Sequence, residues 1–188
     1  MKFDPRLKMN LDELVNSILD DMDQTLFERD DTTFCDPKMA GGQFIKHVEA
    51  RLRDHGHSDR NINRRVFGFA ENLLDIGWAT KTHGLVGQFL TDNYLEQEMK
   101  FTVTLGNPPF SEIAEGVEGA KKTKQNPLYH RFFEKAAESS EVVAMICPKT
   151  EYAKRGFIVD YNNLINEHAQ VIKDCSMHFN VRVETNYI

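Results

Sequence analysis

The chain has 188 residues, of which 40% are hydrophobic and 28% charged, and it carries a formal net charge of −6 with a pI near 5.6. These values are close to globular averages and indicate neither a disordered nor a fibrous protein. The length suits one domain, residues 1–188, with a sizeable core. The acidic balance counts against a free-standing nucleic-acid binder, because neutralising phosphates requires clustered Lys and Arg.

The ends and the cysteines indicate a cytoplasmic setting. The N-terminus lacks an apolar signal core and no stretch approaches 18 consecutive apolar residues, so neither secretion nor a membrane span is expected. Cys35, Cys147 and Cys175 lie far apart without a CxxC pair, which argues against a zinc ribbon and a disulfide framework. The histidines show no HExxH spacing, so no metal site is predicted.

Hydrophobic periodicity predicts alternating helices and strands. A first helix, with apolar residues three or four apart on one face, is expected over about residues 11–23. Strands are then expected at 32–35, 65–69, 85–90, 101–105 and 142–147. Helical patterns separate them or follow, containing Ile45, Leu73, Trp78, Tyr129 and Phe157, and two strand-like segments close the chain at 169–175 and 181–188. Trp78 is interpreted as a core residue.

The fold class that follows is α/β. Strands that alternate with helices form right-handed βαβ units, which build a mostly parallel sheet covered by helices on both faces. Ligands of such sheets bind at the carboxyl ends of the strands. The turns that begin at Asp36 and at Asn107 both lie at that edge.

The stretch from Asn107 to Phe110, with Pro108 and Pro109 between them, follows the fourth strand. Proline cannot continue a sheet ladder and leaves neighbouring carbonyls free to accept hydrogen bonds. The Asn107 side-chain oxygen and a nearby carbonyl form an acceptor pair beside an aromatic ring, which suits a planar ligand with an exocyclic amine. From these four residues alone, a simple proline turn remains the alternative.

A glycine turn follows the first strand, at Gly41 and Gly42. Glycine lets a backbone approach a ligand closely, and a helix N-terminus offers unpaired N–H groups. The pattern is neither GxGxxG nor a P-loop, so dinucleotide and nucleoside-triphosphate sites are disfavoured.

Together, the DP-x-x-x-G-G-x-F turn at residues 36–44 and the NPPF motif at 107–110 resemble the catalytic domains of S-adenosylmethionine-dependent DNA methyltransferases. The closest likeness is to the N6-adenine type of restriction-modification systems, and it extends from the helix at Leu11 to Pro148. The resemblance implies a Rossmann-like class I methyltransferase fold with a seven-stranded sheet. It also implies methyl transfer from S-adenosyl-L-methionine to the N6 amine of a flipped adenine in DNA.

The resemblance also implies a role for each matching residue. The residues nearest the methionine part of the methyl donor would be Asp36, Met39, Gly41 and Phe44. Asp92 would accept a hydrogen bond from the donor's adenine amine, and the first helix would close the donor pocket. Asn107 and the Pro108 carbonyl would bind the target amine, and Phe110 would stack on the base. The loop after NPPF would face the DNA with its three lysines, Lys121, Lys122 and Lys124.

Three departures from the family pattern leave alternatives open. Ala70 stands where the family has a carboxylate for the ribose hydroxyls, and Glu71 could substitute for it. Ala40 and Gln43 replace smaller residues or glycines. No target-recognition domain is evident, so DNA binding is expected to need such a domain or a partner subunit. A catalytically impaired binding or regulatory module is therefore one alternative. Methylation of another amine, on cytosine N4, RNA guanine or protein glutamine, is the other.

Overall fold

The computed structural model describes residues 11–109, 111–112, 126–148, 173–174 and 185–187. Its helices are α1 (Leu11–Asp20), α2 (Thr25–Glu28), α3 (Gln43–Asp54), α4 (Asp59–Arg65), α5 (Leu73–His83), the 3-10 turn η1 (Tyr94–Glu96) and α6 (Tyr129–Ser139). Its strands are β1 (Phe34–Asp36), β2 (Val66–Phe69), β3 (Gln88–Leu90), β4 (Phe101–Gly106), β5 (Ser111–Glu112), β6 (Asn126–Pro127), β7 (Ser140–Pro148), β8 (Lys173–Asp174) and β9 (Thr185–Tyr187).

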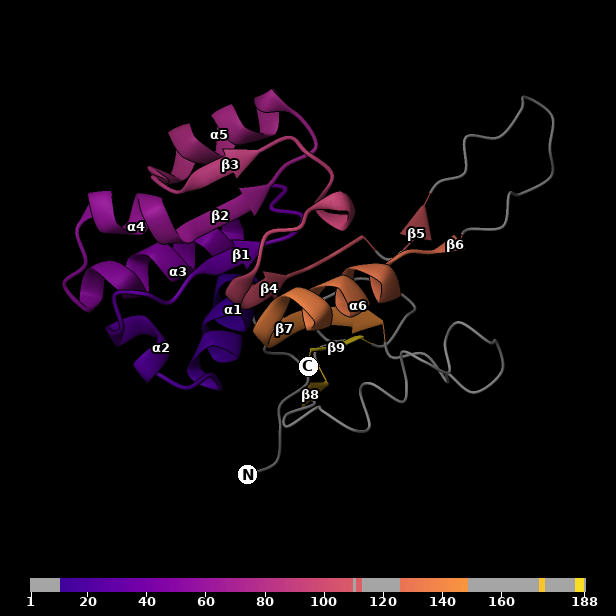
Figure 1. Cartoon of the computed structure of the whole chain (residues 1–188), viewed down its shortest axis with the longest axis horizontal. Coiled ribbons are helices and arrows are strands. Elements are labelled where there is room, and N and C mark those ends of the chain that lie inside the picture. Colours follow the sequence, from indigo (N-terminus) through magenta and orange to yellow (C-terminus); the bar gives the residue numbers. More distant parts are fainter. Residues whose placement is uncertain (1–10, 110, 113–125, 149–172, 175–184, 188) are drawn as a thin grey trace.

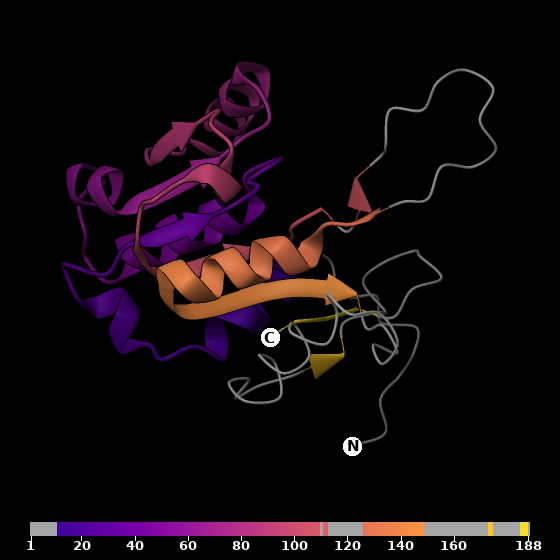
Figure 2. The same cartoon turned by 45° about the vertical axis from the view of Figure 1, so that its right-hand side comes forward.

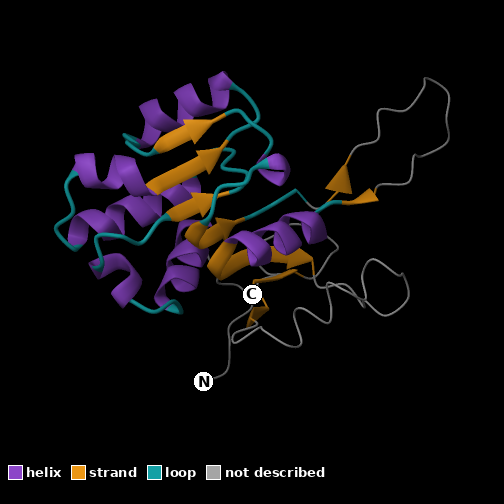
Figure 3. Cartoon of the chain, in the orientation of Figure 1, coloured by secondary structure: helices purple, strands orange, loops and turns teal. Residues whose placement is uncertain are grey.

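Seven strands form the main sheet, in the order β3-β2-β1-β4-β7-β9-β8. The first five are parallel to one another, and β9 and β8 extend the sheet with antiparallel pairing. Helices lie on both sides of the strands (Figure 3). The predicted mostly parallel sheet with helices on both faces is therefore confirmed.

The chain reverses its direction of travel across the sheet between β1 and β4. From β1 it continues to β2 and β3 on one side, and from β4 it continues to β7 on the other. Phe34 pairs with Val103 and Cys35 with Thr104, so β1 and β4 are direct neighbours. Such a switch point leaves a crevice at the carboxyl ends of the two strands, where open α/β sheets bind ligands.

Alternate side chains of the strands enter two separate cores. On one face, Phe34, Val66 and Leu105 pack with apolar residues of α1 and α3, including Leu14, Ile18, Ile45, Val48 and Leu52. On the other face, Cys35, Phe69 and Phe101 pack with Tyr94 of η1 and Phe132 of α6. Tyr94 and Phe132 stack with ring centroids 5.9 Å apart. Figure 2 shows α6 lying along β7 on this second face.

Several sequence-based boundaries needed correction. The predicted helix over 11–23 ends at Asp20 and is followed by the short helix α2, and the charged segment before β2 contains the unpredicted helix α4. The third strand is shorter than predicted, and within the strand-like ends at 169–175 and 181–188 the described residues form β8 and β9. The helix expected near Phe157 lies outside the described residues.

Of the five arginines between residues 51 and 65, Arg53, Arg60 and Arg64 are exposed, as a charged segment is expected to be, whereas Arg51 and Arg65 are not. Arg65 is only 3% exposed, because it ends α4 against the sheet. Arg51 bonds to the Asn16 carbonyl and pairs with Asp20, and its guanidinium lies 5.7 Å from the Phe27 ring centroid. Arg51 thus links α3 to α1 and α2.

Candidate active site

The NPPF motif begins where β4 ends. Gly106 is the last residue of that strand, and Asn107 follows it as an exposed residue, while Pro108 is buried and Pro109 half-buried. The two prolines thus anchor a turn whose first side chain is accessible. Phe110 and the three lysines, Lys121, Lys122 and Lys124, lie outside the described residues. Beyond the motif, β5 and β6 pair as a small two-stranded sheet away from the body of the molecule (Figure 1).

The carboxyl group of Asp36 lies directly beside this turn. Asp36 ends β1 with 2% of its surface exposed, and its Oδ1 accepts a hydrogen bond from the Lys38 N–H at 3.0 Å. A Cβ built on Gly106 would lie 2.8 Å from the same Oδ1. Burial raises the pKa of Asp36 to about 7, although the Lys38 bond works in the opposite direction. The first and fourth strands therefore bring their predicted site motifs together.

The loop from β1 to α3 folds tightly over the ends of β1 and β2. The Met39 N–H donates to the Phe69 carbonyl at 2.8 Å, which ties the loop to β2. Ala40 has φ +28° and Gly42 has φ +75°, so both adopt left-handed backbone. A Cβ on Gly42 would come within 2.9 Å of Leu85, so glycine is also needed there for close packing of α3.

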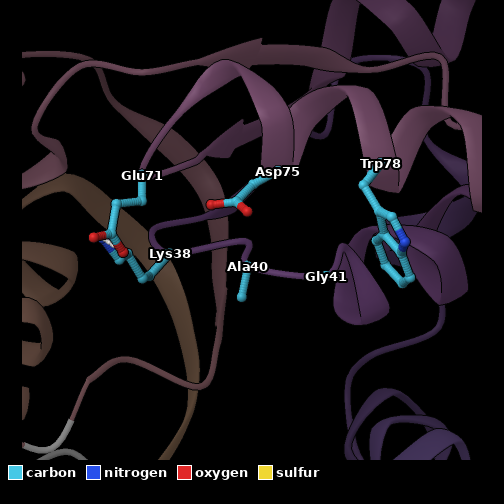
Figure 4. Close-up of a pocket in the computed structure, with 6 residues that line it drawn as sticks. All are labelled: Lys38, Ala40, Gly41, Glu71, Asp75 and Trp78. Atoms are coloured by element: carbon cyan, nitrogen blue, oxygen red, sulfur yellow. Dashed lines mark ion pairs between the residues drawn. The ribbon is translucent and has the colours of Figure 1, made fainter.

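A pocket of about 220 Å³ opens between this loop and the start of α5 (Figure 4). The residues that line it are Lys38, Ala40, Gly41, Glu71, Asp75 and Trp78. The Lys38 ammonium and the Glu71 carboxylate pair across one end at 3.4 Å. Neither Gln43 nor Met39 lines the pocket, so neither side chain fills this space.

The predicted donor residues occupy different environments. Gly41 and Glu71 line the pocket, whereas Met39 and Phe44 are buried in the core. Asp92 follows β3 and is exposed. Ala70 is buried, and its N–H donates to the Leu90 carbonyl at 2.8 Å, so it prolongs the pairing of β2 with β3. Glu71 is thus the first residue past β2 whose carboxylate can reach a ligand.

Sequence reasoning missed Lys38 and Asp75, and it placed Trp78 wrongly. Trp78 is 55% exposed and lies at the mouth of the pocket, whereas a core position was expected. Asn72 and Asp75 cap α5, since the Asp75 N–H donates to the Asn72 side chain at 3.0 Å. A polar cap residue followed three positions later by an acid is a helix-start pattern, and it could have located Asp75 at the ligand-binding edge.

In the described part of the chain, the His, Cys, Asp and Glu side chains form no group of three suited to a metal ion. Within the same residues, no helix is long and apolar enough to span a bilayer.

The family model of the Eco57I restriction-modification methylases matches residues 14–179. The chain belongs to this family. The match contains both sequence motifs and the whole parallel part of the sheet. The resemblance to a restriction-modification methyltransferase that the motifs indicated is therefore confirmed for this Eco57I-family chain. A search of curated proteins found no match to its sequence.

Solved structures of methyltransferases share the fold of the Eco57I-family chain. The M protein of the type I restriction enzyme EcoKI superposes with a TM-score of 0.69 at 16% identity, over 99% of this chain and 44% of that one. A protein described as a class I S-adenosylmethionine-dependent methyltransferase, from Listeria monocytogenes, gives 0.68 at 11% identity, over 100% and 61%. The type I methyltransferase subunit from Streptococcus thermophilus gives 0.62 at 15%, over 96% and 43%. The predicted class I methyltransferase fold is thus confirmed, and the chain spans less than two thirds of each of these relatives.

Proposed function

We propose that this chain is the catalytic core of an S-adenosylmethionine-dependent DNA methyltransferase that acts on the N6 amine of adenine. The observation that carries the proposal is the contact between Asp36 and Gly106, which joins the predicted donor loop to the predicted acceptor turn. Transfer of a methyl group requires donor and acceptor within a few ångströms, and these motifs are about 70 residues apart in sequence.

The residues present fit the methyl donor. The loop from Asp36 to Phe44 holds its methionine part, and Glu71 accepts hydrogen bonds from the ribose hydroxyls. Asp92, which follows the neighbouring strand β3, accepts from its adenine amine. The open pocket beside Gly41 and Glu71 supports this arrangement, because a regulatory module without a donor would not need it.

When bound, S-adenosylmethionine supplies a methyl group on a sulfonium sulfur, which is already a strong electrophile. The protein therefore mainly orients the attacking nitrogen, and such positioning contributes roughly 7–11 kcal/mol to catalysis. The Asn107 side-chain oxygen and the Pro108 carbonyl accept hydrogen bonds from the two amine hydrogens. These acceptors stabilise the positive charge that grows on nitrogen during attack, and they favour the transition state over the ground state.

Base flipping and DNA contact are inferred from the sequence motifs, because Phe110 and the three lysines lie outside the described residues. An exocyclic amine lies inside a duplex stack, so the base must be flipped out, and stacking on Phe110 offsets part of a cost of a few kcal/mol. Lys121, Lys122 and Lys124 contact the phosphates near the flipped base. The acidic chain binds DNA together with a recognition domain or partner subunit, in the cytoplasm.

The test measures methyl transfer from labelled S-adenosylmethionine to adenine-containing DNA, with the modified nucleoside identified by mass. Asn107→Ala should lower the rate by about 10²–10³-fold. Because Asn107 is exposed, the variant should keep the thermal stability of the wild type. Label on cytosine N4, on RNA or on protein would overturn the adenine assignment, and unchanged transfer by Asn107→Ala would overturn its catalytic role.

A further inference from the structure

Helix α5 exposes most of its large apolar side chains. Leu73, Leu74 and Trp78 are 75%, 83% and 55% exposed. The only other exposed large apolar residue in the described part of the chain is Leu11, at the start of α1. Monomeric proteins rarely gather such residues on one surface, and an exposed apolar patch is typical of a site that contacts another macromolecule. The outer face of α5 is therefore a candidate interface.

The position of α5 leaves this face open. β3 is the edge strand of the main sheet, and α5 lies at that edge of the molecule (Figures 1 and 2). Ala79 turns one side of the helix into the core, whereas Leu74 and Lys81 lie on the opposite side and are exposed. Among the described elements, none covers that outer side.

The residues of the outer face follow a charge pattern that is its own complement. Leu74, Trp78 and Lys81 are four and three residues apart, a spacing that places them on one stripe of a helix. Glu71, three residues before Leu74 and just ahead of the helix N-cap, extends the stripe at its other end. The stripe therefore has an acidic end, an apolar middle and a basic end, and it matches a second copy of itself that runs antiparallel.

The antiparallel register pairs every member of the stripe. Leu74 of each copy meets Trp78 of the other, and each Glu71 then meets Lys81 of the other copy, because these charges stand three residues outside the apolar pair at either end. Glu71 is 73% exposed, and the exposed Lys81 makes no ion pair with a described residue. A parallel arrangement would instead bring like charges together. Complementary charges of this kind select a partner and fix its register.

We propose that the outer face of α5 is a homodimer interface in which two copies of the helix pack antiparallel about a two-fold axis. Both copies use the same patch, as a two-fold interface requires. One helix face buries less than the roughly 800 Å² per partner of a standard interface, so the dimer is reversible. Glu71 and Trp78 also line the pocket, so the second copy lies at the rim of that pocket.

Sedimentation equilibrium of the whole chain tests the dimer. Over about 1–500 µM, the range in which weak interfaces associate, the mass should rise from 21.7 kDa toward twice that value. Leu74→Gln should weaken association about tenfold or more, because the symmetry removes a buried leucine from both copies. Leu74 is exposed in the single chain and glutamine is a good helix former, so thermal unfolding of the dilute variant should match that of the wild type.

Two charge reversals test the register. Lys81→Glu and Glu71→Lys should each weaken self-association about threefold or more, because each brings like charges together at both ends of the helix pair. An equimolar mixture of these two variants restores both opposite-charge contacts, so it should associate about as strongly as the wild type. Lys100→Glu is the matched control, since it changes the net charge as Lys81→Glu does but lies exposed before β4, and it should have no effect.

Three results would contradict the proposal, and none of them bears on methyl transfer. A wild-type chain that stayed monomeric over the whole concentration range would overturn the homodimer. A dimer that Leu74→Gln left unchanged would show that α5 is not the interface. A mixture of the two charge variants that associated no better than either variant alone would disprove the antiparallel register.

Discussion

The Oδ1 atom of Asp36 lies so close to the backbone of Gly106 that a Cβ there would stand 2.8 Å from it. Both residues end parallel neighbouring strands, and Asn107 follows at once. Only glycine leaves room for a carboxyl group at this point.

Replacing Gly106 with alanine should therefore disturb the junction of the two motifs. The added methyl group would also lie 3.2 Å from Pro37, so both the Asp36 side chain and the loop must shift. We expect a loss of about 1–3 kcal/mol in the free energy of unfolding, measured by urea denaturation. Gly77→Ala is the control, because a Cβ at Gly77 in α5 meets nothing within 4 Å, and it should stabilise by about 0.5–1 kcal/mol. Equal stability of Gly106→Ala and wild type would contradict the contact.

Asp36→Asn should change how stability depends on pH. Burial raises the Asp36 pKa from 3.8 to about 7 in the folded state, so the stability it contributes is fully present below about pH 4 and is lost as the pH rises to 7. Asparagine does not titrate. Between about pH 4 and pH 7, the free energy of unfolding of the variant should therefore rise relative to that of the wild type, by about 4 kcal/mol at most.

Urea unfolding between about pH 4 and pH 8 measures this difference. The exposed Asp54→Asn should follow the wild-type curve throughout. If Asp36→Asn ran parallel to the wild type at every pH, the raised pKa would be disproved.

A buried carboxylate joins α3 to the segment before β3. Glu49 is fully buried and accepts hydrogen bonds from the N–H groups of Val86 and Gly87 and from Arg53. Glu49→Ala leaves two partly buried N–H groups without this partner and opens a cavity at a fully buried position, and we expect a loss of about 2–5 kcal/mol in denaturant unfolding. Glu49→Gln keeps one acceptor oxygen and should lose clearly less. Similar losses in the two variants would show that side-chain packing, rather than hydrogen bonding, is what matters at this position.

The left-handed backbone at Ala40 carries strain that glycine would relieve. Ala40 has φ +28°, where a side chain is unfavourable, so Ala40→Gly should raise the free energy of unfolding by up to about 1 kcal/mol despite the extra freedom of the unfolded chain. The same exchange within α6, Ala137→Gly, should lower it by about 0.5–1 kcal/mol. Differential scanning calorimetry should thus give shifts of opposite sign, and a destabilised Ala40→Gly would argue against the strain.

The alternation of strands and helices and the positions of the site motifs could be predicted because they depend on local signals. The apolar run into Asn107 and the turn after Asp36 identify strand ends, and the alternation of elements gives the parallel sheet. The environment of α5 could not be predicted in this way. Leu74 and Trp78 have core-like spacing, yet they are 83% and 55% exposed, because only the opposite side of α5, with Ala79, packs into the core. Hydrophobic residues at helical spacing indicate that a helix has an apolar face, but not what that face packs against.

Arg65 and Glu71 illustrate the same limit for charged residues. Arg65 belongs to a run of arginines that is typical of a solvated surface, yet its place at the end of α4 buries it. From the sequence, Glu71 could be named only as a replacement for the carboxylate that is missing at Ala70. Ala70 continues the pairing of β2 with β3, and a difference of one residue in the length of β2 decides which side chain points away from the sheet toward the pocket.

The reversal between β1 and β4 divides the molecule into two continuous lengths of chain. Residues up to β3 build one side of the sheet, and β4 to β7 build the other, so the seam between them passes beside Asp36 and Gly106. In the proposed function, a methyl donor held by the first length and a base held by the second meet across this seam. Small movements of one side relative to the other would change the distance between the methyl donor and the accepting nitrogen. A molecule that contacts both sides would hold this distance fixed.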